Sequence, residues 1–479
     1  MCFVITGLFL VNAFNLYKRM MGAEEVVSAL SDQYVKPVGI FYPRGNIYDS
    51  RGIRFTNTQG ICGIYAPSKA ESAAVAKNVV GEVAIDKDKT TSEGCKGISG
   101  IQALYDSLLS GGSAVKLNAY VDAMGNVTDA GYYVLNDHIN EGCDIYLTLD
   151  YHIQKRYEEV LKEYSAQNNV KNLSAVLIEI KTGNILAMAS EGGEMNNAVL
   201  SYQPGSIMKI ITAAVAYERG LIDESTTYDC DGKVDVGGHE RGCAGGAVHG
   251  NITIARALGV SCNCCFYTLA KELTYELPNG AMGSYVLDKA RLWGFSSYGQ
   301  PNKDRFPLEY EEHYSFVPEM LYNEMDIFNC ALGEGRTQAS CLIMAKITGA
   351  IAGGGVMNEP KIVDRITDAA GNIVPLEDEK VFDLGLKAET IEWLKGAMLQ
   401  TAISGTAAGV DLNATGGFAG KTGTAENASD KPHGWFTGYF PANSPEYSLC
   451  VFIEQGTSGI KAAGLFGILA KELYNIYPD

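Results

Sequence analysis

Three short strings stand in a fixed order along this chain, and they constrain its fold and chemistry more than any other feature. They are S-x-x-K at 206–209, S-x-N at 261–263 and K-T-G-T at 421–424. Each string alone occurs by chance in many proteins. All three together, each in a plausible structural context, predict acyl transfer through a serine ester.

The first string predicts a serine at the start of a helix. Pro204 and Gly205 break the preceding segment, and the apolar run 207–216 predicts a helix that Ser206 opens. The N-terminal end of a helix favours developing negative charge. Residues three apart share a helix face, so the Lys209 amine can reach the Ser206 hydroxyl. Burial or neighbouring cations can lower the pKa of such a lysine and make it a base.

The second string lies between two segments that read as helices, 253–258 and 264–270. On a short loop, Ser261 and Asn263 can both point into a cleft. The serine can then pass on a proton, and the asparagine can hold a substrate amide at both ends. Serine and asparagine at a helix junction are usually caps, so this string alone favours the cap role.

The third string sits in a run of small residues that predicts a strand with room beside it, 418–425. Gly423 lets another backbone approach closely. A substrate laid along such an edge gains main-chain hydrogen bonds, and Lys421 with the two threonine hydroxyls can bind a carboxylate. A second K-T-G, at 181–183, lies between two apolar runs and predicts a hairpin turn instead.

Further motifs lie outside these strings. They are R-G-N-I-Y-D-S-R-G at 44–52, G-I-S-G-I-Q at 97–102, L-T-L-D at 147–150 followed by Gln154, L-G-E-G at 332–335, I-A-G-G-G at 351–355 and H-G-W-F-T-G-Y at 433–439. With them the chain resembles the class B penicillin-binding proteins, peptidoglycan D,D-transpeptidases, from about Tyr17 to its end. Ser50 is an insertion relative to the family's first box. Gln102 stands where the family has Glu, which removes an acid from any charge pairing of the small domain and leaves the chemistry unchanged.

The resemblance implies a role for each residue of the three strings. Ser206 is the nucleophile and Lys209 its base, Ser261 relays a proton to the leaving group, and Lys421 sets the electrostatics of that serine. Asn263, Thr422, Gly423 and Thr424 form the substrate-binding set, in which Asn263 holds the acyl-chain amide and the two threonines bind the terminal carboxylate. The backbone N–H groups of Ser206 and Thr424 would form the oxyanion hole.

The function implied is cross-linking of peptidoglycan stem peptides through an acyl-enzyme formed from a D-Ala-D-Ala donor, with covalent inhibition by β-lactams. The implied partners are a membrane glycan polymerase and division or elongation proteins. The net charge of −18 argues against nucleic acid as a partner.

The N-terminus is expected to anchor the chain in the bacterial cell membrane. Residues 1–17 are uncharged and apolar, slightly short of the ~20 residues that a span needs. Lys18 and Arg19 follow, and the positive-inside rule would place the rest of the chain in the cytoplasm. The resemblance implies the opposite, a single anchor with the catalytic domain on the extracellular side. We follow the resemblance and expect that a basic leader is missing from the start.

Three domains are expected: the anchor at 1–17, a smaller strand-rich pedestal, dimerisation-like, at 18–148, and a transpeptidase domain at 149–479. The fold class is α+β, the penicillin-binding/transpeptidase fold, with an antiparallel sheet flanked by helices and a helical subdomain. Expected elements include a helix over 153–164, strands at Lys421, Trp435 and 448–453, an all-helical middle and a last helix over 462–474.

The chain has twelve cysteines, many for an exported protein. Cys230 and Cys243 bracket a glycine-rich loop and are candidates for a disulfide, although buried free thiols are the favoured state. There is no pair of C-x-x-C strings, so the sequence predicts no metal site and no cofactor. His249 and His433 are expected to be structural.

Three alternatives to the transpeptidase remain open. A D,D-carboxypeptidase uses the same chemistry with water as acceptor, and the motifs do not decide between acceptors. A class A β-lactamase needs E-x-x-L-N after S-x-N, and the nearest string, E-M-L-Y-N at 319–323, has the wrong spacing. A non-catalytic β-lactam sensor or division scaffold would be expected to carry upstream membrane spans or to have lost a catalytic residue, and this sequence shows neither.

Overall fold

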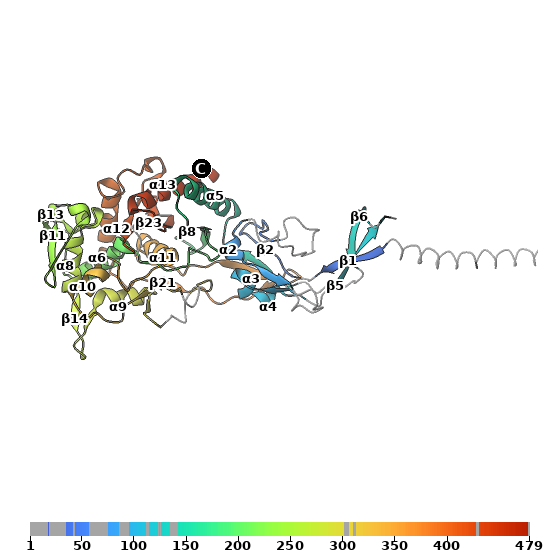
Figure 1. Ribbon diagram of the computed structural model, residues 1–479, viewed down its shortest axis with the longest axis horizontal. Helices are drawn as coiled ribbons and strands as arrows, with labels where there is room; N and C mark the ends of the chain where they lie inside the picture. Colours follow the sequence, from blue (N-terminus) through green and yellow to red (C-terminus); the bar gives the residue numbers. More distant parts are fainter. Residues whose placement is uncertain are drawn as a thin grey trace, which may run out of the picture.

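The computed structural model describes residues 18, 35–41, 44–56, 75–85, 95–111, 115–122, 124, 126–134, 142–300, 306–309, 313–427 and 431–477. The expected anchor lies outside these residues. None of the described helices is both long and apolar enough to cross a bilayer. In Figure 1 the elements after residue 142 form a broad body, and the sheet of β1, β5 and β6 lies at some distance from it.

A five-stranded antiparallel sheet forms the centre of the C-terminal body. Its order is β22 (Ala419–Ala425), β23 (His433–Phe440), β24 (Tyr447–Ile453), β8 (Leu173–Glu179) and β9 (Ile185–Glu191). The hairpin predicted around the K-T-G at 181–183 is confirmed, as are the three predicted C-terminal strands. The sheet places β22, with the third string, at its edge.

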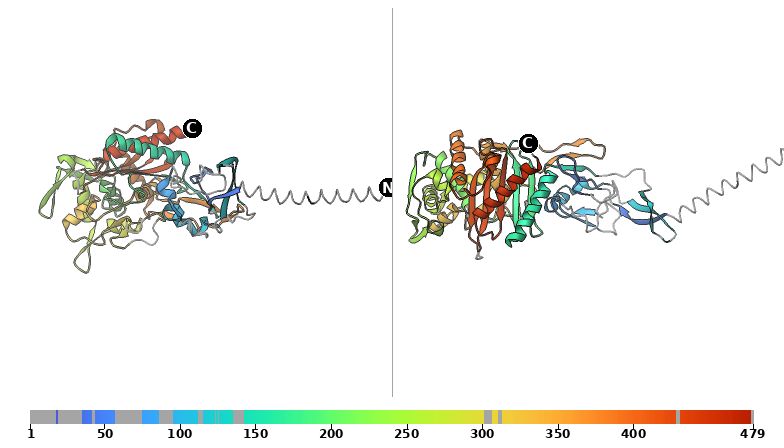
Figure 2. Two further views of the ribbon diagram at one scale, coloured as in Figure 1. Left: turned by 45° about the vertical axis from the view of Figure 1, so that its right-hand side comes forward. Right: turned by 90° about the horizontal axis from the view of Figure 1, so that it is seen from above.

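Helices cover both faces of this sheet. On one face lie α5 (Tyr151–Asn168) and α13 (Gly459–Ile476), which pack against each other (Figure 2), and on the other lies α11 (Cys341–Ala352). Successive side chains of a strand point to opposite faces. Accordingly Leu177 packs into the core under α5 and α13, and Ile178 into the core under α11. A sheet buried on both sides explains why β8 is apolar along almost its whole length.

The middle of the chain contains the expected helical subdomain, but it is not all helical. Its helices are α6 (Lys209–Glu218), α7 (Ile254–Gly259), α8 (Asn263–Glu272), α9 (Tyr285–Leu292), α10 (Glu324–Ala331) and α12 (Ala388–Ile403). Between α6 and α10 the described residues form four two-stranded sheets, β10–β13, β11–β12, β14–β15 and β16–β17. These strands have only two to four residues, so any hydrophobic alternation along them is too short to identify a strand from the sequence.

The described part of the predicted pedestal contributes to two larger sheets and, third, to a two-stranded sheet of β3 (Val83–Ile85) and β4 (Cys95–Gly97). The first has the order β1 (Val35–Phe41), β5 (Val115–Val121), β6 (Val127–Val134). The second is β2 (Ile47–Tyr48), β7 (Asp144–Leu147), β19 (Val363–Thr367) and β20 (Ile373–Val374). Its last two strands come from far along the chain: β19 pairs antiparallel with β7, and β20 pairs antiparallel with β19. Short helices α2 (Lys77–Val80), α3 (Gly100–Leu104) and α4 (Asp106–Leu109) lie in the same region of the sequence.

Gln102, which stands where the family has Glu, is hydrogen-bonded to a buried arginine whose counter-ion comes from a nearby residue. The Arg44 guanidinium is buried and donates to the Gln102 side-chain oxygen at 2.8 Å and to its backbone carbonyl at 3.0 Å. Its ionic partner is instead Asp106, at 2.7 Å. A buried arginine is costly without a counter-ion. Asp106 therefore supplies the charge that Gln102 lacks.

The first box also joins the N-terminal part of the chain to α5. Asp49 is fully buried and accepts hydrogen bonds from the backbone of Arg51 and Ile53 within its own turn. Its second oxygen accepts from the Tyr151 N–H at the start of α5, at 3.2 Å. This carboxylate therefore joins the N-terminal box to the first helix of the predicted transpeptidase domain.

Candidate active site

The serine of the first string sits on a tight turn that is pressed against the edge strand. Gly205 begins the 3-10 turn η2 (Gly205–Met208) with a φ of +59°, and its N–H donates to the Gly333 carbonyl at 2.9 Å. A Cβ on Gly205 would lie 2.5 Å from the Thr424 carbonyl oxygen. Ser206 therefore stands on this turn, and α6 begins three residues later than the sequence predicts.

Lys209 links the first string to the second. Its side chain is fully buried, and Nζ donates to Asn263 Oδ1 at 2.7 Å, to the Ser261 carbonyl at 3.0 Å and to Ser261 Oγ at 3.2 Å. These bonds use all three protons of an ammonium group. Among the hydrogen bonds of the described residues, none joins Lys209 to Ser206. Burial lowers the pKa of Lys209 to about 8.

The second string is a strained corner between α7 and α8, and neither Ser261 nor Asn263 is a helix cap. Cys262 caps α8 by accepting from the Cys265 N–H, and Thr253 caps α7. Ser261 has a φ of +60°, which is unusual for a residue with a side chain. Such strain persists only where the surroundings enforce it, and it is common at functional sites.

Lys421 of the third string is also fully buried, and its Nζ donates to the Thr422 carbonyl at 2.8 Å. Burial and the positive charge of Lys209 hold its pKa well below the usual range. The two lysines are therefore close enough to repel each other. A cationic neighbour is one of the means by which a lysine becomes a base.

The other residues of β22 make contacts within the chain. Thr422 Oγ1 and Thr406 Oγ1 are hydrogen-bonded at 2.5 Å, and Thr424 Oγ1 accepts from the Gly459 N–H at 3.0 Å. A Cβ on Gly423 would lie 2.6 Å from the Pro204 carbonyl oxygen. The predicted close approach at Gly423 is confirmed, and the approaching backbone is the segment before the serine turn.

Two further residues of the site were not singled out by sequence reasoning. Glu334 lies near Lys209, and burial, with the charge of Glu426, raises its pKa to about 7. Thr406 orients Thr422 as described above. Glu334 lies in the L-G-E-G motif, from which it could have been predicted as a site residue. Thr406 lies in a segment without a motif.

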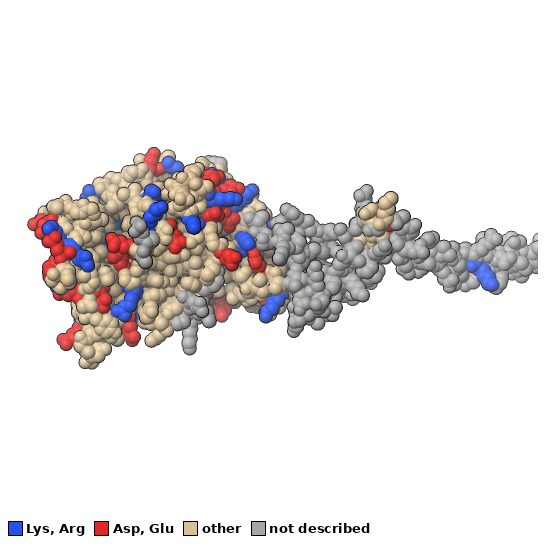
Figure 3. Space-filling view, viewed as in Figure 1, with Lys and Arg blue, Asp and Glu red and all other residues tan. Residues whose placement is uncertain are grey.

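The β-lactamase-like string at 319–323 is not part of the contacts described above for the three strings. Asn323 caps α10 by accepting from the Asp326 N–H at 2.9 Å, and Glu319 is exposed. His433 is the buried first residue of β23 and accepts from the Gln455 N–H at 3.2 Å, which fits the structural role expected for it. Figure 3 shows acidic and basic side chains interspersed over one face of the body, without a continuous basic surface on that face.

One group of side chains departs from the sequence expectation. Cys230 and Cys243 are free thiols with sulfurs 3.8 Å apart, so the candidate disulfide is not formed. Together with His249 and Cys262 they form a cluster that can hold a metal ion. These four residues come from four separate segments of the chain. The sequence therefore contains no pair of C-x-x-C strings from which the cluster could be predicted.

Comparison with known proteins assigns the fold and the family. Residues 173–473, more than half of the chain, match the family described as the penicillin binding protein transpeptidase domain. The penicillin-binding protein PbpB of Mycolicibacterium smegmatis is 26% identical over 445 residues, 84% of this chain and 63% of PbpB. The peptidoglycan D,D-transpeptidase MrdA of Acinetobacter baumannii is 26% identical over 426 residues, 80% of this chain and 61% of MrdA. The chain thus spans about three fifths of the length of these relatives.

Solved structures agree on the fold. Penicillin binding protein 3 of Mycobacterium tuberculosis in complex with ampicillin superposes with a TM-score of 0.70 at 23% identity, covering 93% of this chain and 98% of that one. A chain of a peptidoglycan synthase complex that coordinates polymerization and crosslinking gives 0.65 at 20% identity, covering 99% and 98%. The α+β penicillin-binding fold is thereby confirmed, and the chain belongs to the class B penicillin-binding proteins.

Proposed function

We propose that the protein is a peptidoglycan D,D-transpeptidase with Ser206 as its nucleophile. The observation that carries the proposal is the buried Lys209, which joins the serine turn to Ser261 and Asn263 beside a second buried lysine. The activity of MrdA, a relative along four fifths of the chain, supports the same reaction.

Acylation begins when neutral Lys209 takes the proton of the Ser206 hydroxyl. With a pKa of about 8, roughly a tenth of Lys209 is neutral at pH 7. Ser206 Oγ then attacks the carbonyl carbon of the penultimate D-Ala, and backbone N–H groups of Ser206 and Thr424 stabilise the oxyanion. As the peptide bond breaks, the terminal D-Ala nitrogen receives a proton through Ser261. Lys209 already donates to Ser261 Oγ, so this relay needs no rearrangement of the lysine.

Asn263 and residues of β22 orient the substrate. The Asn263 oxygen accepts from Lys209 and its amide donates to the Gly242 carbonyl at 3.1 Å, so the side chain is fixed from both ends before it meets a substrate amide. Thr422 and Thr424, with the charge of Lys421, bind the carboxylate of the donor. In deacylation an amine of a second stem peptide attacks the ester, an amide forms, and Ser206 recovers its proton.

We also propose that residues 1–17 anchor the chain in the cell membrane, with the catalytic domain outside and a membrane glycan polymerase as partner. The apolar character of that segment and the peptidoglycan synthase complex of the same fold support this. Fractionation of cells that express the chain with and without residues 1–17 tests it. Membrane association that survives the deletion would contradict the anchor.

Intact-mass spectrometry after incubation with benzylpenicillin tests the nucleophile. We expect one stable penicilloyl adduct on the wild type and none on Ser206→Ala. Ser225→Ala is the matched control, because Ser225 is exposed on a turn remote from the three strings in sequence, and it should be acylated like the wild type. An adduct on Ser206→Ala, or an unmodified wild type, would contradict the assignment, and rapid hydrolysis of the antibiotic would indicate a β-lactamase.

A further inference from the structure

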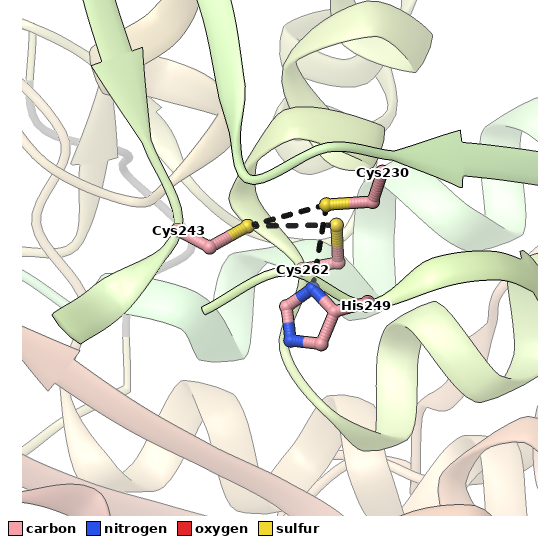
Figure 4. A group of neighbouring side chains, drawn as sticks. All are labelled: Cys230, Cys243, His249 and Cys262. Atoms are coloured by element: carbon pink, nitrogen blue, oxygen red, sulfur yellow. Dashed lines mark hydrogen bonds between the residues drawn. The ribbon is translucent and has the colours of Figure 1, made fainter. Parts of the chain in front are cut away.

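Four potential metal ligands converge behind the second string. Cys230 ends β10 (Thr227–Cys230), Cys243 follows β12 (His239–Gly242), His249 precedes β13 (Gly250–Thr253), and Cys262 caps α8. Figure 4 shows the three sulfurs and the His249 Nδ1 pointing toward a common centre. All four ligand atoms lie within 4.8 Å of one another.

The spacing of these atoms matches a tetrahedral zinc site. Two sulfurs each about 2.3 Å from a tetrahedral Zn²⁺ lie about 3.8 Å apart, and a sulfur and an imidazole nitrogen lie about 3.6 Å apart. The Cys230–Cys243 and Cys243–Cys262 sulfur distances are 3.8 and 3.7 Å, and Cys230 Sγ lies 3.4 Å from His249 Nδ1. A disulfide would require about 2.05 Å between sulfurs.

The surrounding segment has little else to hold it together. Between 227 and 253 the buried residues are Cys230, Gly232, Val236 and Cys243, so two of the four are ligands. Isolated two-stranded hairpins are marginal in water without a core. A bound metal would supply the cross-link that this segment lacks, as it does in small zinc domains.

We propose that Cys230, Cys243, His249 and Cys262 bind one Zn²⁺ in a closed structural site. Three thiolates and one imidazole are a ligand set that zinc accepts, and four protein ligands leave no position open for catalysis. Cys264 also approaches Cys243, with 3.6 Å between the sulfurs, but it is not among the four mutually close ligands.

One ligand of the proposed metal site lies within the second string, so metal binding would affect the residues that the proposed function uses. Cys262 stands between Ser261 and Asn263, and Cys243 follows Gly242, whose carbonyl accepts from the Asn263 amide. The ion would therefore fix both the strained corner and the support of Asn263. This consequence rests on the proposed transpeptidase chemistry, whereas metal binding itself does not.

Metal content of the purified full-length chain is the first test. We expect one zinc per chain by plasma mass spectrometry, and cobalt substitution should give thiolate charge-transfer and tetrahedral d–d absorption. His249→Ala should lose the d–d pattern of the full site and bind zinc at least tenfold more weakly. Because His249 is half-buried, this variant is expected to fold even if Cys262→Ser does not. Cys330→Ser, which alters a buried thiol outside the cluster, should keep one zinc.

Different results would refute the metal site, the proposed function and the coupling between the two. A wild type that stays metal-free after addition of Zn²⁺, with these thiols titrating as free, would refute the site, and so would a Cys230–Cys243 disulfide in non-reducing peptide mapping. Removal of zinc should slow penicillin acylation about tenfold, with recovery on re-addition. If the chain holds one zinc but neither form is acylated, the proposed function fails while the metal site stands. Acylation that is indifferent to zinc would refute the coupling.

Discussion

The two sides of the candidate site are built in opposite ways. The sheet side, η2 with β22, is fastened by backbone packed against backbone at Gly205 and Gly423 and by a sheet buried on both faces. The loop side, residues 230–253 with the corner at 261–263, has few buried side chains and is held by thiols and polar groups. The proposed nucleophile thus stands on the tightly packed side, and the proposed proton relay on the side that polar groups hold. Lys209 bridges the two.

Removal of the Lys209 amine, which bridges the two sides, should have the largest effect on the acylation rate. Lys209→Met preserves the volume of the side chain but deletes the base, so we expect the rate of penicillin acylation to fall about 10³-fold. Stopped-flow measurement with a fluorescent penicillin checks this. Lys346→Met is the control, because Lys346 lies on α11, outside the three strings, and pairs with Glu359, so its replacement should leave the rate unchanged. A Lys209→Met rate within tenfold of the wild type would exclude a base role.

The pH profile tests the same bridge without a mutation. Burial lowers the pKa of Lys209 to about 8, so the neutral base accumulates as the pH rises through that value. The acylation rate should therefore rise about 50-fold between pH 6 and pH 8 and level off above pH 9. A rate that is flat over this range would mean that Lys209 does not titrate in the step.

The packing of the sheet side can be broken selectively. Gly205→Ala combines left-handed strain with a clash against the Thr424 carbonyl, and we expect it to lower the free energy of unfolding by about 3 kcal/mol. Gly220→Ala has a similar φ of +71° with nothing within 4 Å, so it should cost only about 1 kcal/mol. Urea unfolding measures both, and equal losses would show that close packing at Gly205 adds nothing.

Hydrogen exchange sharpens the contrast between the two sides. If the loop side depends on the metal, chelation should speed exchange of the amides in 231–250 about tenfold and leave those in β24 unchanged. The experiment is read by mass spectrometry of peptic peptides with and without a chelator. A uniform change across both regions, or none in 231–250, would contradict the division.

The smallest effect is expected at the Thr406–Thr422 hydrogen bond. Thr406→Val removes a hydroxyl partner at nearly constant volume and should weaken carboxylate-dependent acylation by about 1 kcal/mol, a roughly fivefold change. Thr406→Ser keeps the hydroxyl and should behave like the wild type. An equal loss in both variants would point to packing in place of the hydrogen bond.

The sequence was most informative where chemistry is local. The hairpin at 181–183, the edge strand at 419–425 and the last helix all follow from patterns within about twenty residues. The strand pairing of β7 with β19 joins segments more than two hundred residues apart and leaves no local pattern. The expected α-helical start at Ser206 failed because Gly205 adopts a left-handed conformation to approach β22, which only the tertiary contact explains.

The same distinction applies to the site. Ser261 and Asn263 were named from the second string, but their shared partner Lys209 could not be fixed by spacing alone, since i and i+3 proximity pointed to Ser206. The thiol cluster was missed because successive ligands are separated by six to thirteen residues and converge only through two hairpins and the start of α8. Motif spacing reveals a site when its ligands share one element, and these do not.

The most direct test of the account is a cross-linking assay with a stem-peptide donor that ends in D-Ala-D-Ala and a labelled amine acceptor. We expect release of D-Ala together with incorporation of the acceptor into a new amide, and neither product with Ser206→Ala. Release of D-Ala without any incorporation would show that water is the acceptor, and it would contradict the transpeptidase assignment in favour of a D,D-carboxypeptidase.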